Sequence, residues 1–155
     1  MKYVIDTNIL IHIVRNSSTW EYVDMTFNPF DFPKNETYVS FASVAEILSL
    51  SLKLGWQDKK ISRLSEFLSK LEIISVSGEV EDKLMQNYAL IDAYSQGKLK
   101  NLPLPTTMSA RNMGKNDIWI AATASSIEAT LLTTDNDFVH LDTVFCKVIL
   151  IETNK

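Results

Sequence analysis

The chain has 155 residues, a formal net charge of −4 at pH 7, and apolar and charged fractions of 46% and 22%, values typical of one globular domain over residues 1–155. Its composition argues against a membrane protein, because no uncharged apolar run approaches the roughly 20 residues of a membrane helix, and against a disulfide scaffold, because Cys146 is the single cysteine. An N-terminus without a signal-peptide layout adds to the expectation of a cytoplasmic protein.

The distribution of apolar residues predicts strands and helices that alternate along the chain. In chain order the predicted elements are a strand over 2–5, a helix over 8–15, a short extended piece over 37–40, helices over 43–54 and 58–71, a strand over 73–76, a helix capped by Ser77, a helix over 117–128, and strands over 130–133 and 147–151. Alternating strands without a polar face are typical of a parallel sheet with helices on both faces, a three-layer α/β fold. In such a sheet, ligands bind beyond the carboxyl ends of the strands.

Four carboxylates stand where the chain turns from one predicted segment to the next: Asp6, Glu46, Asp117 and Asp135. Asp6 and Asp135 each follow a predicted strand, and Asp117 opens a predicted helix. A carboxylate next to apolar residues risks burial, and burying a charge is costly unless another group compensates it. Four such groups from distant segments suggest one shared compensator, a divalent cation held by oxygen ligands.

Each of these carboxylates also has a purely structural interpretation. Asp6 can cap the helix that follows it, Asp117 together with Asn116 can cap the next one, and Asp135 can close a turn through a bond to its own backbone. The segment Ser43-Val44-Ala45-Glu46 fits a capping box, in which Glu46 reaches back to the cap. A capping role does not exclude a metal role, so both interpretations stay open at the level of the sequence.

The stretch from Ala93 to Asn116 contains no acidic residue, although the chain as a whole is acidic. It carries four cations and leads directly into Asp117; the four are Lys98, Lys100, Arg111 and Lys115. Cations for phosphates beside carboxylates for metal are what a metal-dependent nuclease requires. We therefore predict that the four cations bind the phosphates of a nucleic acid, with a solvated surface loop as the alternative.

Four motifs, taken together and in order, resemble those of the PIN-domain ribonucleases over the whole span from Met1 to about Ile151. The motifs are Asp6-Thr7-Asn8 after the first strand, Ala45-Glu46-Ile47-Leu48, Asn116-Asp117-Ile118-Trp119-Ile120-Ala121-Ala122, and Leu132-Thr133-Thr134-Asp135-Asn136-Asp137-Phe138. The likeness is greatest to the VapC-type toxins of bacterial toxin–antitoxin pairs. It implies a short parallel sheet between helices and RNA cleavage that depends on Mg²⁺ or Mn²⁺. The partners it implies are a second copy of the chain and a small antitoxin whose tail covers the site.

The resemblance assigns roles to individual residues of this chain. The catalytic acids are Asp6, Glu46, Asp117 and Asp135. The auxiliary residues are Asn8, Thr133 and Asp137. From the chemistry of metal-dependent cleavage we expect Asp6, Asp117 and Asp135 to be metal ligands, with Asp135 at a second site or bound through water, while Glu46 ligates metal or orients the attacking water. The four cations of the acid-free stretch are predicted to bind RNA from their charge alone.

The segment from Trp20 to Tyr38 departs from the compact toxins, because it is longer and rich in aromatic residues. These residues are Trp20, Tyr22, Phe27, Phe30, Phe32 and Tyr38. We expect them to pack on the protein's own core, with a partner or dimer surface as the alternative.

Other functions stay open on the sequence alone. A protein of this fold can process or bind RNA outside toxin–antitoxin pairs, or bind a partner without catalysis. An aspartyl-phosphate phosphatase also begins with an aspartate at a strand end, but it needs a second one two residues later, where this chain has Asn8. His12 and His140 lack the sequence context of catalytic bases.

Overall fold

A parallel sheet of five strands forms the centre of the structure, a computed structural model that describes residues 1–77 and 81–153. The strands are β1 (Lys2–Ile5), β2 (Glu36–Ser40), β3 (Glu72–Ile74), β4 (Thr130–Thr133) and β5 (Lys147–Leu150). They lie in the order β3-β2-β1-β4-β5, and every pairing is parallel. All strands therefore end at the same edge, and the predicted parallel α/β fold is confirmed.

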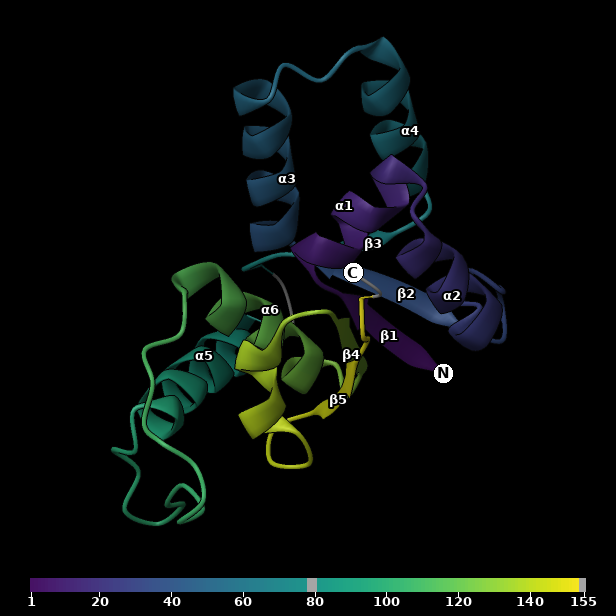
Figure 1. Ribbon diagram of the computed structural model, residues 1–155. Coiled ribbons are helices and arrows are strands. Elements are labelled where there is room, and N and C mark those ends of the chain that lie inside the picture. Colours follow the sequence, from purple (N-terminus) through teal and green to yellow (C-terminus); the bar gives the residue numbers. More distant parts are fainter. Residues whose placement is uncertain (78–80, 154–155) are drawn as a thin grey trace.

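Helices cover both faces of this sheet (Figure 1). They are α1 (Thr7–Arg15), α2 (Ser18–Phe27), α3 (Phe41–Lys53), α4 (Asp58–Leu68), α5 (Glu81–Ser95), α6 (Lys115–Ser126) and the 3-10 helix η2 (Asn136–Leu141). One side of the sheet carries α1, α2 and α4, and the other carries α5, α6 and η2. Because α3 packs against both α1 and α6, it joins the two helical layers at the carboxyl edge.

The strands fill two hydrophobic cores, because successive residues of a strand point to opposite faces of the sheet. In β1, Tyr3 and Ile5 belong to the core under α1, α2 and α4, whereas Val4 belongs to the core under α5 and α6. Strand β4 divides in the same way between Leu132 and Leu131. Burial on both faces explains why the sequence shows continuous apolar runs at these strands.

Each predicted strand and helix is present, but several boundaries differ. The helix predicted over 43–54 begins at Phe41, and the helix predicted over 117–128 begins at Lys115. The predicted start of α5 near Ser77 falls beside residues 78–80, outside the described ranges. Two elements were not predicted. Helix α2 buries only three of its residues and so lacks a clear apolar stripe, and the 3-10 geometry of η2 does not follow the α-helical period.

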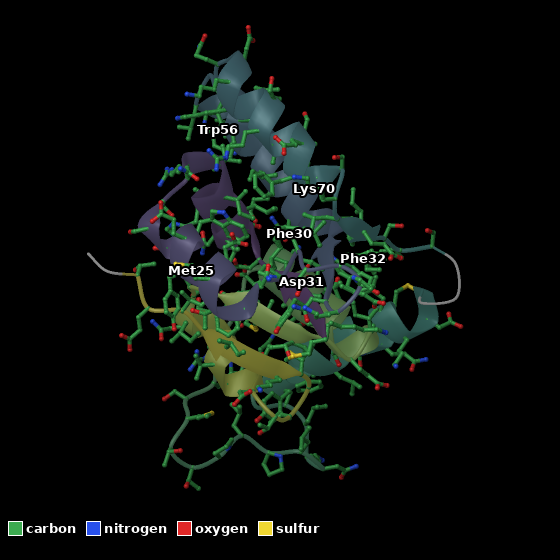
Figure 2. All side chains as sticks on the ribbon, turned by 90° about the vertical axis from the view of Figure 1, so that its right-hand side faces the viewer. Met25, Phe30, Asp31, Phe32, Trp56 and Lys70 are labelled. Atoms are coloured by element: carbon green, nitrogen blue, oxygen red, sulfur yellow. The ribbon has the colours of Figure 1, made fainter. Side chains whose placement is uncertain are left out.

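The aromatic-rich segment after α1 contains a packed group and an exposed group. Trp20 is 6% exposed, and its ring lies 5.7 Å from that of Phe30 and 5.9 Å from that of Phe67, measured between ring centroids. Phe32 is 79% exposed, and it lines a surface hollow together with Lys70 (Figure 2). The expectation of packing on the core is confirmed for Trp20, Phe27, Phe30 and Tyr38 and is wrong for Tyr22 and Phe32.

The structure bears on two features of the composition, the lack of a long apolar run and the single cysteine. In the two described ranges, every helix is too short or too polar to cross a bilayer. Cys146 is partly buried against the second core, just before β5 rather than within a strand. Burial raises the pKa of its thiol to about 12, so Cys146 is protonated at neutral pH and is a poor nucleophile.

Candidate active site

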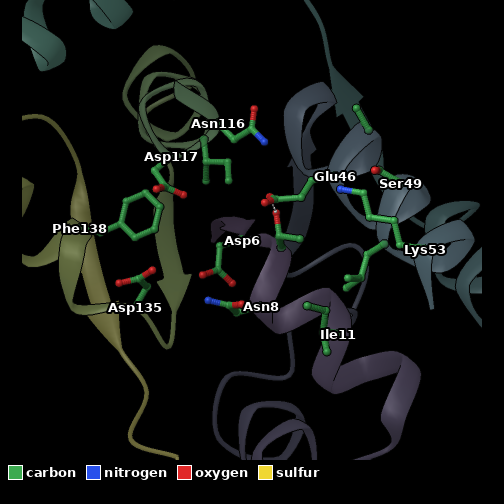
Figure 3. A pocket seen from close by; sticks show the side chains of 14 residues that line it. Asp6, Asn8, Ile11, Glu46, Ser49, Lys53, Asn116, Asp117, Asp135 and Phe138 are labelled. Carbon is green, nitrogen blue, oxygen red and sulfur yellow. Dashed lines mark hydrogen bonds between the residues drawn. The ribbon is translucent and has the colours of Figure 1, made fainter. Parts of the chain in front are cut away.

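The four carboxylates identified in the sequence line one pocket at the carboxyl edge of the sheet (Figure 3). Asp6 follows β1, Glu46 lies on α3, Asp117 lies in the first turn of α6, and Asp135 follows β4. The pocket has a volume of about 650 Å³. Side chains that are far apart in the chain thus meet where the strand ends predicted they would.

Asp6 is the most deeply buried acid of the pocket, with 2% of its surface exposed. One carboxylate oxygen accepts the backbone N–H of Ile9 at 2.8 Å, so Asp6 caps α1 as predicted. The other oxygen accepts the hydroxyl of Thr133 at 2.5 Å. Desolvation outweighs both hydrogen bonds and raises the pKa of Asp6 from 3.8 to about 7, and the charges of Asp135 and Asp117 add to the rise. The ionised carboxylate therefore lacks compensating positive charge.

Thr133 connects two of the acids through a single hydroxyl group. Its Oγ1 donates to Asp6 and accepts the backbone N–H of Asp135 at 2.9 Å. The side chain is fully buried at the end of β4, where the strand fixes its direction. Asp135 in turn accepts the N–H of Asp137 at 2.9 Å, which confirms its predicted turn-closing bond. Thr133 thus sets the position of Asp135 relative to Asp6.

Glu46 points toward α1 rather than toward a helix cap. Its carboxylate accepts the hydroxyl of Thr7 at 2.6 Å. The capping box predicted from Ser43 to Glu46 is wrong, because α3 begins earlier and uses Ser40 as its N-cap. Ser43 is instead fully buried. Glu46 is exposed to the pocket, so its carboxylate is accessible to a ligand bound there.

Asp117 lies in the first turn of α6, where backbone N–H groups favour negative charge. The N-cap of this helix is Gly114, and a Cβ atom added to it would lie 2.6 Å from Oδ2 of Asp117. Desolvation raises the pKa of Asp117 from 3.8 to about 6, and the charges of Asp135 and Glu46 add to the rise. Because its pKa responds to both of these neighbours, the carboxylates form one electrostatic cluster.

The donor chemistry of this cluster fits a divalent cation. Carboxylate oxygens are preferred ligands of Mg²⁺ and Mn²⁺, and two of the acids have raised pKa values in a site crowded with negative charge. Among residues 1–77 and 81–153, however, no three Asp, Glu, His or Cys side chains lie close enough together to hold a metal ion as they stand. Two hydrogen bonds fix Asp6, so metal binding requires the other carboxylates to turn toward it.

Within the described part of the pocket lining, Lys53 of α3 is the one cation, and the sequence analysis missed it. Lys53 follows Glu46 by two helical turns, so both side chains project from the same face of α3 (Figure 3). That spacing was a usable signal. The cations predicted from the sequence lie instead in the acid-free stretch before Asp117.

The predicted RNA-binding and auxiliary residues occupy different places. Among the described residues, none of Lys98, Lys100, Arg111 and Lys115 lines the pocket. Arg111 approaches the cluster indirectly, with its guanidinium 3.8 Å from the carboxylate of Asp137.

Asn8 lines the pocket, with its amide pointing toward the acids (Figure 3). His12 and His140 do not line it, and His140 is buried with Nε2 2.7 Å from Oγ of Ser95.

Comparison with known proteins gives consistent results. The family model described as "PIN domain" matches residues 3–144. Ribonuclease VapC2 of Haemophilus influenzae is 28% identical over 138 residues, which cover 88% of this chain and 87% of that protein. The solved structure of VapBC-1 from nontypeable Haemophilus influenzae matches with a TM-score of 0.66 at 22% identity, over 97% of this chain and 98% of that one. A toxin–antitoxin complex from Klebsiella pneumoniae matches with a TM-score of 0.64 at 20% identity, over 97% and 99% of the two chains. These two structures share the fold of this chain.

Proposed function

Because the chain belongs to the PIN domain family, we propose that it is a divalent-metal-dependent endoribonuclease that cleaves RNA phosphodiester bonds. The observation that carries the proposal is the convergence of four carboxylates from four elements on one pocket; they are Asp6, Glu46, Asp117 and Asp135. The similarity to a protein named a ribonuclease supports RNA as the substrate.

The four acids would have different roles in catalysis, according to how the structure holds each side chain. Asp6, Asp117 and Asp135 would hold Mg²⁺ or Mn²⁺, and a cation bound there would offset the phosphate charge and lower the pKa of a water molecule. Asp6 is fixed by its hydrogen bonds and supplies the rigid side of the site. Glu46 is accessible from the pocket and either orients the attacking water or adds a ligand. Asn8 lines the pocket, and its amide would donate a hydrogen bond to a phosphate oxygen.

Cations in and near the pocket would hold the RNA. Lys53 lines the pocket, and the acid-free stretch with Lys98, Lys100, Arg111 and Lys115 precedes Asp117 in the chain. Arg111 is the best supported of the four, because it approaches Asp137. Replacing Arg111 and Lys115 by Ala should flatten the dependence of log affinity on log salt by about 0.7 for each single-strand phosphate that the variant no longer binds. An unchanged salt slope would leave this stretch a solvated loop.

The ribonuclease proposal is tested by assaying Asp6→Asn and Asp117→Asn on single-stranded RNA with Mg²⁺ or Mn²⁺. Asparagine keeps the shape of the side chain but removes the charge that holds the cation, so both variants should lose cleavage while remaining folded. Asp24→Asn is the matched control on the exposed face of α2, and it should cleave like the wild type. Full activity of both site variants, or wild-type cleavage in excess chelator, would contradict the proposal.

We further propose that the enzyme is the toxin of a toxin–antitoxin pair and acts in the cytoplasm. The supporting observation is the match over nearly the whole chain to a structure described as a toxin–antitoxin complex. Its partners would be a small antitoxin and a second copy of the chain. Induced expression in a bacterial host should arrest growth, and Asp117→Asn should abolish the arrest. Unimpeded growth with the active enzyme would instead favour an RNA-processing role outside such pairs.

A further inference from the structure

A cationic hollow lies at the opposite end of α1 from the acid pocket. Its volume is about 550 Å³, and its walls come from the C-terminal end of α1 and the first half of α4. The lining residues are Val14, Arg15, Asn16, Lys59, Lys60 and Arg63. The hollow therefore has four cations and no acid among its lining residues, so it is suited to an anion.

No ion pair involves the four cations of the hollow within the described part of the chain. There, no carboxylate lies within 4.0 Å of the charged nitrogens of Arg15, Lys59, Lys60 or Arg63. Arg63 has a structural role, because its guanidinium donates to Oδ1 of Asn16 at 2.5 Å and lies 5.8 Å from the centroid of the Phe67 ring. The other three cations are exposed and available to a ligand.

One face of α1 connects the acid pocket with the hollow. Asn8, Ile11 and Arg15 are spaced by three and four residues and so share this face. Asn8 and Ile11 line the acid pocket, and Arg15 lines the hollow. A rise of 1.5 Å per residue separates Asn8 from Arg15 by about 10 Å along the helix axis. The two sites are thus close enough for one extended ligand.

Helices α3 and α4 stand on either side of α1 and contribute cations along this path (Figure 1). Lys53 at the end of α3 lines the acid pocket, and Lys60 near the start of α4 lines the hollow. The ammonium group of Lys60 lies 5.9 Å from the ring centroid of Trp56, which is partly buried in the turn that joins these helices (Figure 2). Positive charge therefore continues from one site to the other.

We propose that this hollow binds a backbone phosphate of single-stranded RNA, so that the strand runs along α1 into the acid pocket. The inference rests on the proposed ribonuclease function and adds to it a second phosphate site that fixes where the strand lies. A nucleic acid suits the hollow better than an acidic protein segment does. Protein partners need apolar anchors, and Val14 is the sole apolar residue among those described in the lining. Phosphate contacts of this kind set register and orientation rather than base sequence.

The test compares two triple variants that remove the same charge. The site variant is Arg15→Gln, Lys59→Gln and Lys60→Gln, which leaves Arg63 and its contacts intact. The control variant is Lys2→Gln, Lys83→Gln and Lys147→Gln, with Lys2 and Lys147 at the opposite edge of the sheet, where β1 and β5 begin. Each full-length protein is titrated with a labelled oligouridylate of about 12 nucleotides, within the usual range of single-strand sites, and with a trinucleotide. Titrations use Ca²⁺ to limit turnover and cover a series of salt concentrations.

Wild type and control variant should bind the long oligonucleotide more tightly than the trinucleotide, and the site variant should lose most of this difference. Its salt slope for the long oligonucleotide should be flatter by about 2, the sum of three contacts to a single strand. With Mg²⁺, its KM for cleavage of the long RNA should rise while kcat stays unchanged.

Equal affinity and salt slope in the site variant and the wild type would overturn the proposal while leaving the ribonuclease proposal intact. Failure of the wild type to bind RNA at all would overturn both, so the two failures are distinguishable. An oligoglutamate of similar charge serves as the probe for an acidic protein partner. If the site variant loses affinity for that peptide but keeps its affinity for RNA, the hollow is a protein-binding site and the proposal is wrong.

Discussion

Asp6 is almost fully buried and, as buried polar groups usually are, it is hydrogen-bonded at both carboxylate oxygens. The N–H of Ile9 and the hydroxyl of Thr133 fix both of its oxygens, but two neutral donors do not replace the hydration that burial removes. Its pKa of about 7 records this deficit. A bound cation would correct the deficit, and we therefore propose that Asp6 binds metal in addition to capping α1.

In metal-free protein, Asp6 should make the folded state less stable as the pH rises from 3.8 toward about 7. An acid whose pKa is raised by folding contributes stability that is fully present below its unfolded pKa and is lost as the pH rises through its folded pKa. Urea unfolding in chelator across this window should show a steeper fall for the wild type than for Asp6→Asn. A smaller slope should persist in the variant, because the pKa of Asp117 is also raised, to about 6. Identical pH dependence in the two proteins would show that Asp6 ionises normally.

Gly114 is predicted to be a positioning residue, because its missing side chain makes room for Asp117. A Cβ atom would lie 2.6 Å from Oδ2 of that carboxylate, closer than Cβ atoms approach non-bonded atoms, so Gly114→Ala should push the carboxylate aside. The backbone of Gly114 has φ −59°, which alanine adopts without strain, so the fold should persist. A displacement of about 1 Å can cost up to a hundredfold in rate, and we expect a loss approaching that size with an unchanged melting temperature. Cleavage at the wild-type rate would show that Asp117 tolerates the shift.

At the scale of the elements, strand ends and helix starts were readable from the sequence, whereas side-chain directions were not. Asp6 and Asp135 follow buried apolar runs, and parallel strands bring their carboxyl ends to one edge, so this part of the site was predictable. The hydrogen-bond partner of Glu46 was not predictable. Ser40 and Ser43 are both plausible N-caps of α3, and moving the helix start by three residues changes the direction at the cap by most of a turn. The cations of α4 approach the site only through the packing of α1 against α4, which no local pattern encodes.

Helix α3 carries an apolar stripe on the face turned away from the core, and we propose that a second copy of the chain covers it. Leu48 and Leu52 are 48% and 82% exposed, and their spacing from Phe41 places all three on one face. The double variant Leu48→Glu and Leu52→Glu should therefore sediment as a monomer. The matched control is Tyr22→Glu with Met25→Glu, two exposed apolar residues on α2, and it should keep the wild-type assembly. A monomeric wild type, or site and control variants that assemble alike, would contradict a dimer through α3.

At the scale of the whole molecule, the parallel sheet gathers negative charge at one edge and leaves positive charge along the helices beside it. The acid pocket lies between the two helical layers, and Lys53, Arg15 and the cations of α4 border the approach along α1. This separation would allow a chain with a net charge of −4 to bind a polyanion, because its acids would meet the phosphate through a bound cation. A cation that binds only the folded protein also stabilises it by mass action.

The shared metal site is tested most directly by the crystal structure of the protein soaked in Mn²⁺, with the metal located by its anomalous scattering. We expect a peak between Asp6, Asp117 and Asp135, with carboxylate oxygens at about 2.0–2.2 Å, as for hard divalent ions of this size. The side chains of Asp117 and Asp135 should have turned toward Asp6 relative to the arrangement described above, and the peak should be absent or much weaker in crystals of Asp117→Asn. A fully occupied Mn²⁺ elsewhere with none at these three residues, or an equal peak in the Asp117→Asn crystals, would contradict the proposed site.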